Sequence, residues 1–253
     1  GGVVFLEVLR ALEHVDIGKI SHNSSRYFHL LAEAMKHSYA DRAHHLGDPD
    51  FVEVPIERLL SVDRTVEIRN AFNPESTYPT EFYGERIAPP SDGGTQHISA
   101  QDAELGVALT TTINTSFGSG LVVKDLGLIL NNEMDDFSSA PGVPNAYGLV
   151  GSEANAIAPG KRPLSSMTPT VVLDPKGSIY MVLGASGGST IISACIQVFL
   201  NIVEYGMDPQ EAVAAPRMHH QWVPEELTLE PETPSDVIDA LRAKGHKVVL
   251  KPA

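Results

Sequence analysis

Hydrophobic residues recur at helical spacing through about the first 60 residues. The stretches VVFLEVLRALEHV (3–15) and SSRYFHLLAEAMKHSYADRAHHLG (24–47) each repeat apolar residues at intervals of three and four. A serine opens the second stretch and Gly47 closes it, as helix caps would. Short helices are expected to continue through residues 55–73. Residues 73–94 then contain four prolines and end in Asp-Gly-Gly, which predicts an extended, solvent-facing linker.

From Thr95 onward the pattern changes to the two-residue alternation of strands. Residues 95–102 and 107–115 predict a hairpin that turns at DAELG, and residues 169–184 predict another that turns at Asp-Pro-Lys-Gly. The other elements expected are a strand at 126–132, a long buried helix after the glycine pair at 187–188, a helix at 209–222, a strand at 227–230, a capped helix at 234–245 and a last strand at 246–251. This order, without an internal repeat, predicts a layered α+β domain rather than alternating βαβ units.

Composition and charge narrow the class of protein. The chain has 253 residues, of which 42% are hydrophobic and 20% charged, enough for one large domain or two small ones. A net charge of −14 argues against nucleic-acid binding, because phosphate recognition needs clustered Lys and Arg. Cys195 is the only cysteine, which excludes an internal disulfide, and its apolar neighbours predict a buried side chain. No apolar run approaches the roughly 20 residues of a membrane span.

Gly93, Gly94 and Thr95 join the proline-rich stretch to the first strand, and two interpretations compete. In one, the glycine pair is an ordinary loop, which is the favoured interpretation when the tripeptide stands alone. In the other, Gly94–Thr95 is a processing site, because a nucleophile can reach the carbonyl of a residue without a Cβ. Cleavage would leave Thr95 with a free α-amine, whose ordinary pKa near 7.7–8.0 lets it act as the general base for its own hydroxyl.

Three polar clusters could contact a small charged ligand. Glu133, Asp135 and Asp136 follow an apolar stretch and could hold an ammonium group or Ca²⁺, although their spacing does not fit a metal loop and a solvated acidic turn is simpler. Ser165 and Ser166 could bind a carboxylate or form a serine-rich turn. The glycines of GASGGS (184–189) could form an anion pocket or merely start a helix.

Two further pairs have a functional and a structural interpretation. Thr112 and Asn114 share one face of the second strand, so they could orient a nucleophile on the neighbouring strand or simply favour β structure. His219 and His220 would point in different directions from the helix expected there, which favours packing over joint metal binding.

The order of these features along the chain resembles the γ-glutamyltransferases, also called glutathione hydrolases. The blocks that carry the resemblance are ADRAHHLGDPDFV, TQHIS, TINTSFGSG, LNNEMDDFS, PGVPNAYGLVG, NAIAPGKRPLSSMTPT, GASGGS and APRMHHQW. They extend over nearly the whole chain, and the longest of them are highly specific.

This resemblance implies an N-terminal-nucleophile hydrolase with a four-layer αββα sandwich, made as a precursor that cuts itself between Gly94 and Thr95. Residues 1–94 would be the C-terminal part of the large subunit, helical and then extended. Residues 95–253 would be the small subunit, which carries the nucleophile and is truncated at its C-terminus. The two subunits would form a heterodimer.

The same resemblance implies roles for individual residues. Thr95 matches the nucleophile that takes the γ-glutamyl group from glutathione or a related γ-glutamyl compound and passes it to water, an amino acid or a dipeptide. Thr112 matches a hydroxyl that assists processing and catalysis. The remaining matches are Asn114, Glu133 and Asp136 for the substrate's α-amino end, Ser165 and Ser166 for its α-carboxylate, Gly187 and Gly188 for the oxyanion hole, and Tyr147 for a loop that covers the pocket.

Three departures from the family pattern affect these expectations. Gln96 stands where Thr or Ser is usual, Ser186 stands where Pro is usual, and the family's carboxylate-binding arginine belongs upstream of Gly1. The chain opens without an initiator methionine and stops just after a strand-like stretch. We therefore expect both ends to be incomplete, and such a chain by itself to bind and turn over substrate poorly.

Two alternatives remain open. A related acylase would cleave β-lactam side chains or transfer poly-γ-glutamate, but Asp135, Asp136 and the serine pair favour a glutamyl group. An uncut, inactive remnant would act as a binding or structural module; intact Thr95 and Thr112 count against it and the missing ends count for it. No metal or organic cofactor is indicated. The resemblance to bacterial members implies a periplasmic or secreted location.

Overall fold

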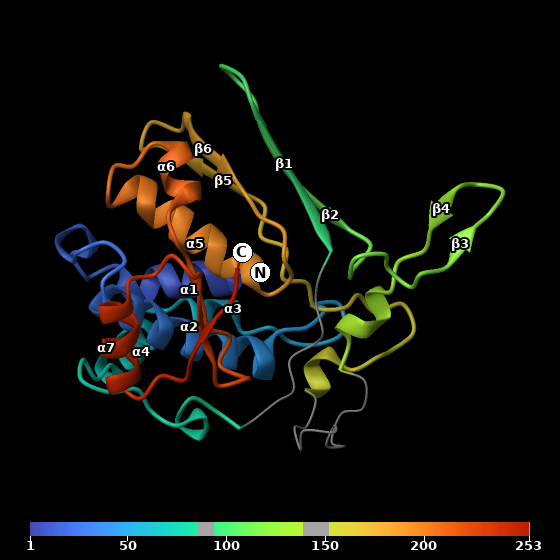
Figure 1. The fold of residues 1–253 in the computed structure, drawn as a ribbon. Coiled ribbons are helices and arrows are strands. Elements are labelled where there is room, and N and C mark those ends of the chain that lie inside the picture. The colour runs from blue at the N-terminus through green and yellow to red at the C-terminus, as the bar shows by residue number, and fades with distance from the viewer. Residues whose placement is uncertain (86–93, 139–151, 253) are drawn as a thin grey trace.

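The computed structural model describes residues 1–85, 94–138 and 152–252, and it has the predicted α+β organisation. Figure 1 shows helices α1, α2, α5 and α7 in one body, from which the β1–β2 and β3–β4 hairpins project. Within the described ranges, no helix is both long enough and apolar enough to cross a bilayer.

The helical half agrees with the predicted periodicity. Its helices are α1 (Gly2–Leu12), α2 (Ser25–His45), α3 (Ile56–Leu59) and α4 (Val62–Ala71), with a 3₁₀ turn at Ile17–Lys19. The Ser24 side chain caps α2 by accepting from the Tyr27 amide, and Ser61 caps α4 in the same way. α1 packs against α2, α4 and α5, so helices from both ends of the sequence share one core.

The expectation of a solvent-facing linker fits residues 73–85 only in part, because Pro74, Glu75 and Pro79 are exposed whereas Thr80 and Tyr83 are buried. A 3₁₀ turn at Thr80–Phe82 interrupts this segment, the Tyr83 hydroxyl donates to Glu33 Oε2 at 2.6 Å, and the Thr80 carbonyl accepts from Trp222 Nε1 at 2.9 Å. The Tyr83 ring is 8% exposed and packs edge-on against His37 of α2, and burial of this ring outweighs the extended preference of the proline-rich backbone. Residues 86–93 lie outside the described ranges.

Both predicted hairpins are present. β1 (Thr95–Gln101) pairs antiparallel with β2 (Gly106–Thr112), and β5 (Thr170–Leu173) pairs with β6 (Ile179–Leu183). β6 lies beside both β1 and β2. The single strand predicted at 126–132 is instead half of a short hairpin of β3 (Val122–Val123) and β4 (Leu128–Ile129). Gly127, at φ +63°, permits the tight turn that folds this apolar run back on itself.

α5 (Thr190–Val203) is the long buried helix predicted after the glycine pair. Cys195 is buried on it, as expected, and burial raises the pKa of its thiol to about 12. The helix predicted at 209–222 is much shorter than expected. The observed helix, α6, spans only Pro209–Ala214. Ala215 is extended before Pro216, since a residue that precedes proline disfavours the helical region.

A three-stranded sheet completes the fold. It consists of β7 (Met218–His219), β8 (Leu227–Leu229) and β9 (Val248–Leu250), with α7 (Ser235–Ala243) between the last two. The cap predicted for α7 is not found, since no side chain among the residues that the structure describes caps this helix. His219 Nδ1 bonds the Ser193 hydroxyl, whereas His220 Nδ1 accepts from the Trp222 amide. The two rings therefore have separate packing partners, although they lie on and beside a strand rather than on the expected helix.

Glu7 on α1 is an acidic side chain buried in the helical core, with an exposure of 1%. Burial raises its pKa to about 9, neighbouring Asp41 adds to the rise, and Arg64 opposes it. Between the ordinary pKa of 4.5 and about 9, the folded protein keeps this carboxyl protonated while the unfolded chain ionises it. Its contribution to stability is therefore complete below pH 4.5 and is lost as the pH rises toward 9.

We expect Glu7→Gln to reduce this loss of stability with rising pH. Between about pH 5 and about pH 8 the wild type should lose on the order of 4 kcal/mol more unfolding free energy than the variant, as measured by urea denaturation. Glu13→Gln, which changes an exposed carboxylate just beyond the same helix, is the matched control. Parallel pH profiles for wild type and Glu7→Gln would contradict the assignment.

Candidate active site

Thr95 and Thr112 face each other across the first hairpin. Thr95 is the first residue of β1 and is 8% exposed, and the strand register pairs it with Thr112 at the end of β2. The Thr95 hydroxyl donates to Thr112 Oγ1 at 3.4 Å. The strand register therefore brings these two threonines together, and a shared role in a site stays a prediction.

The Thr112 hydroxyl also contacts the backbone on both sides of this pair. It donates to the Gly94 carbonyl oxygen at 3.0 Å and accepts from the Asn114 amide at 2.8 Å. A hydroxyl has one proton and two lone pairs, so these contacts and the one from Thr95 use all of them. The Thr112 oxygen is thereby fixed between the Thr95 hydroxyl and the carbonyl of the Gly94–Thr95 peptide bond.

Gly94 is required here for a steric reason that the sequence did not reveal. Its φ is +71°, and a Cβ at this position would lie 1.5 Å from the Thr115 carbonyl oxygen. Asn114 and Thr115 are themselves left-handed, at φ 56° and 47°. The glycine backbone thus fits directly against a strained turn at the end of β2, where no other residue could fit without moving the chain.

Asn114 links this hairpin to the acidic segment 133–136. Asn114 is 1% exposed, and its Nδ2 donates to Asp136 Oδ1 at 2.9 Å. Asp136 ends a 3₁₀ turn (Glu133–Asp136), and Glu133 Oε1 in this turn is buried with no hydrogen-bond partner in the described ranges. Asp135 is exposed and accepts from Asn132. Two of the three acidic residues therefore have buried oxygens beside the hairpin.

Asn155 extends these contacts to the serine loop. Its Nδ2 donates to the Asp136 carbonyl at 2.7 Å, and its Oδ1 accepts from the Leu164 amide at 3.0 Å. Sequence reasoning missed this residue. The available signal was an asparagine beside the predicted serine loop, in the block NAIAPGKRPLSSM, but an asparagine in a loop has no distinctive pattern.

The serine loop is bound to the end of α2. Arg42 Nη2 donates to Ser166 Oγ at 3.0 Å. Asp48 Oδ2 accepts from both the backbone N and Nε of Arg162, at 2.8 and 2.9 Å, and its Oδ1 accepts from Nη2. Ser165 Oγ accepts from the Met167 amide. Sequence reasoning did not single out Arg42, Asp48 or Arg162, because their partners lie more than 100 residues away.

Gly187 and Gly188 form a separate loop at the start of α5. Their φ values of +117° and +64° are left-handed, and the loop is held by Tyr39, whose hydroxyl donates to the Ser189 carbonyl at 2.6 Å. In the described ranges no hydrogen bond joins these two glycines to Thr95. Gly184 contacts the first hairpin, because an added Cβ there would lie 2.2 Å from the His97 ring of β1.

The remaining predicted residues and one cavity are not joined to this cluster by any contact described above. Gln96 is exposed on β1 and pairs with Thr111, and Ser186 is also exposed. Tyr147 lies outside the described ranges. A cavity of about 670 Å³ beside the start of α5 is lined by residues that include Ser186, Ser193 and His219, but by neither Thr95 nor Thr112.

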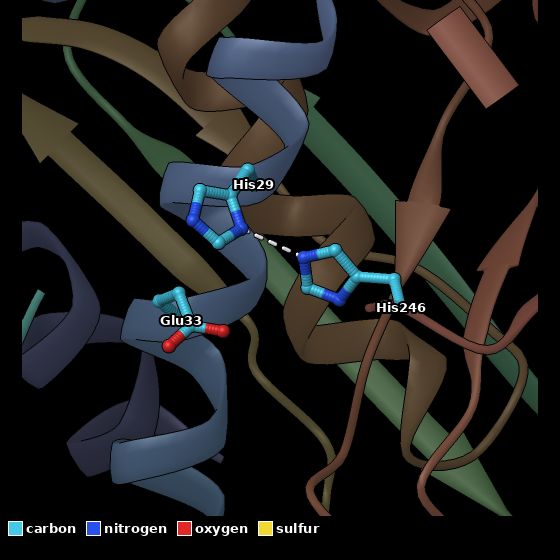
Figure 2. Close-up of side chains that lie close together, drawn as sticks. All are labelled: His29, Glu33 and His246. Atoms are coloured by element: carbon cyan, nitrogen blue, oxygen red, sulfur yellow. Dashed lines mark hydrogen bonds between the residues drawn. The ribbon is translucent and has the colours of Figure 1, made fainter. Parts of the chain in front are cut away.

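One cluster outside this site has the residue types of a metal centre. Figure 2 shows His29, Glu33 and His246 together, and their potential ligand atoms lie within 4.8 Å of one another. His29 Nε2 donates to the Asn73 carbonyl at 2.8 Å, so its Nδ1 accepts from His246 Nε2 at 2.7 Å.

Existing hydrogen bonds make this cluster a poor cation site. Glu33 already accepts from Lys36 at 3.1 Å, Thr77 at 2.7 Å and Tyr83 at 2.6 Å. The Lys36 ammonium occupies the place beside the carboxylate that a cation would need. Burial lowers the pKa of His246 to about 3, which keeps the ring neutral. The cluster therefore fits a network that joins α2 to residues 73–83 and to the segment before β9.

The sequence of this chain is similar to those of known glutathione hydrolase proenzymes. The chain is 44% identical over 255 residues to the glutathione hydrolase proenzyme of Escherichia coli (strain K12), covering 100% of this chain and 44% of that protein. It is 45% identical over 231 residues to the glutathione hydrolase proenzyme of Pseudomonas sp. (strain A14), covering 91% of this chain and 40% of that protein. The chain thus spans less than half the length of these relatives.

The structure of this chain is also similar to solved structures of related enzymes. A mutant of Helicobacter pylori gamma-glutamyltranspeptidase is 50% identical, with a TM-score of 0.58 over 62% of this chain and 85% of that chain. Cephalosporin acylase from Bacillus halodurans has a TM-score of 0.79 over 100% of this chain and 43% of that chain, at 26% identity. The family model described as Gamma-glutamyltranspeptidase matches residues 1–253. Since that match includes every residue, the chain belongs to the gamma-glutamyltranspeptidase family.

Proposed function

We propose that this chain carries the nucleophile and part of the substrate site of a γ-glutamyl acyl-transfer enzyme. The enzyme would cleave the γ-glutamyl amide bond of glutathione and related compounds through an ester on Thr95, and pass the acyl group to water, an amino acid or a dipeptide. The observation that carries the proposal is the Thr112 hydroxyl, which contacts both Thr95 Oγ1 and the Gly94 carbonyl oxygen.

Processing would come first. The Thr95 hydroxyl attacks the Gly94 carbonyl carbon, the Gly94–Thr95 amide bond breaks, and an ester forms while the Thr95 nitrogen takes up a proton. Water then hydrolyses the ester, which releases the Gly94 carboxylate and regenerates the hydroxyl. The hydrogen bond from Thr112 polarises the carbonyl under attack and would stabilise the negative charge that develops on its oxygen.

Turnover would reuse the same hydroxyl. The freed α-amine of Thr95 accepts the hydroxyl proton, and the oxygen attacks the γ-carbonyl of the substrate. The leaving amine departs with a proton, and water or an acceptor amine then releases the glutamyl group from the ester. The amides of Gly187 and Gly188 are proposed to stabilise the oxyanion, each by about 3 kcal/mol.

The glutamyl head group would be bound at two places, its α-ammonium by acidic and amide side chains and its α-carboxylate by serine hydroxyls. Glu133, Asp136 and Asn114 are proposed to hold the α-ammonium, and the buried, unpartnered Glu133 Oε1 supports a cationic ligand. Ser165 and Ser166 are proposed to hold the α-carboxylate, and Tyr147 to cover the pocket. This polar set favours a glutamyl group over the side chain that a cephalosporin acylase would take.

A heterodimer of residues 1–94 and residues 95–253 would follow from the cut. α5 packs against α1, so the two parts share a core that would hold them together. The four-layer αββα sandwich is also proposed, because large apolar side chains are exposed on the described hairpins and an additional layer would cover them; they include Ile98, Val107, Leu109, Leu126 and Leu128. The periplasmic or secreted location remains a prediction from the resemblance.

Thr95→Ala is expected to abolish processing, because no hydroxyl remains to attack Gly94. On a denaturing gel the wild type should give two fragments, and N-terminal sequencing should show that the C-terminal one begins Thr-Gln-His-Ile. Thr111→Ala, which alters an exposed threonine of the same hairpin, should cleave like the wild type. An uncut wild type, or a Thr95→Ala variant cut at the same bond, would refute the processing step.

Asp136→Asn should weaken substrate binding by removing a charged partner of the α-ammonium. We expect the KM for a γ-glutamyl amide to rise about 10- to 100-fold, as for the loss of a hydrogen bond to a charged group. Asp135→Asn changes the exposed neighbouring carboxylate and should leave KM within about 2-fold of the wild type. Equal effects of the two substitutions would contradict the assignment, and steady-state kinetics would distinguish them.

A further inference from the structure

Arg42 lies near the end of α2 and contacts one of the two serines of the proposed carboxylate site. Arg42 is 5% exposed and Ser166 is 4% exposed, and Arg42 Nη2 donates to Ser166 Oγ at 3.0 Å. We infer that Arg42 is a positioning residue, which orients the Ser166 hydroxyl toward the substrate's α-carboxylate. This inference rests on the proposed function.

The direction of this hydrogen bond determines what Ser166 can do. A guanidinium only donates, so it occupies a lone pair of Ser166 Oγ and leaves the hydroxyl proton for another acceptor. A carboxylate only accepts, and it can take that proton. Without Arg42, the hydroxyl could turn and donate to other groups of its own loop.

The rest of the loop is fixed in a way that makes this contact effective. Asp48 holds Arg162 through the backbone N and the guanidinium, and Asn155 Oδ1 holds the Leu164 amide. The segment 162–166 is thus attached at three successive points, and the Ser166 side chain has a defined place beside Arg42. Two of these anchors, Arg42 and Asp48, lie N-terminal to the proposed cut. The N-terminal part would therefore set the geometry of a substrate site on the C-terminal part.

The test is a double-mutant cycle in the full-length protein. Arg42→Met should raise the KM for a γ-glutamyl amide about 10-fold while kcat stays within about 2-fold, because the lost contact acts on binding of the carboxylate. In a Ser166→Ala background the same substitution should change KM by less than about 2-fold, since there is no hydroxyl left to orient. Arg42→Lys retains charge and donors and should recover part of the affinity.

Two comparisons separate this role from a merely structural one. Arg10→Met removes an arginine from an exposed ion pair with Glu13 and should leave both constants unchanged. Binding of L-glutamate by calorimetry gives a readout without turnover, and Arg42→Met should weaken it about as much as it raises KM. If Arg42→Met folds poorly, Arg42→Lys in the two Ser166 backgrounds gives the same comparison.

The possible results decide between the inference and the proposed function. A KM increase that persists undiminished in the Ser166→Ala background, or a loss confined to kcat or to thermal stability, would overturn the positioning role of Arg42 while leaving γ-glutamyl transfer intact. A wild type that neither binds L-glutamate nor turns over γ-glutamyl amides would overturn the proposed function, and the inference with it.

Discussion

The hydroxyl of Thr112 is the group on which the proposed chemistry depends. It contacts the Thr95 hydroxyl, the Gly94 carbonyl and the Asn114 amide at once, so the strand register of a single hairpin places a nucleophile beside the bond it would cut. The geometry requires Gly94, because any Cβ there would collide with the backbone of Thr115. Processing and acyl transfer would therefore use the same arrangement of the Thr95 and Thr112 hydroxyls. This arrangement is already present before the Gly94–Thr95 bond is cleaved.

The surrounding polar contacts form one continuous path from this hairpin to the serine loop. Asn114 binds Asp136, Asp136 is bound by Asn155, and Asn155 holds the Leu164 amide just before Ser165. Each member of this path is buried or half-buried, where an unmade hydrogen bond costs more than a made one gains. Such a path constrains the relative positions of the groups proposed for the two ends of the glutamyl head group.

Local sequence patterns predicted the helices of the first 60 residues, both long hairpins and the burial of Cys195, because these follow from periodicity and neighbouring residues. They failed where contacts distant in sequence prevailed, as when Tyr83 and Glu33 bring the proline-rich segment against α2. The prediction of a helix at 209–222 was wrong beyond Ala214, because Pro216 disfavours the helical conformation of Ala215. The site residues came from motif resemblance, and Arg42 and Asn155 were not found because a single arginine or asparagine has no pattern until its partner is located.

The most direct test of the central claim is to identify the residue that carries the acyl group during turnover. The processed full-length protein would be mixed with a γ-glutamyl amide, quenched rapidly in acid and mapped by peptide mass spectrometry. We predict one added glutamyl residue on the peptide that begins at Thr95, and its loss on mild alkaline treatment, as expected for an ester. A glutamyl group on any other residue, or sustained turnover with no acylated Thr95, would contradict it.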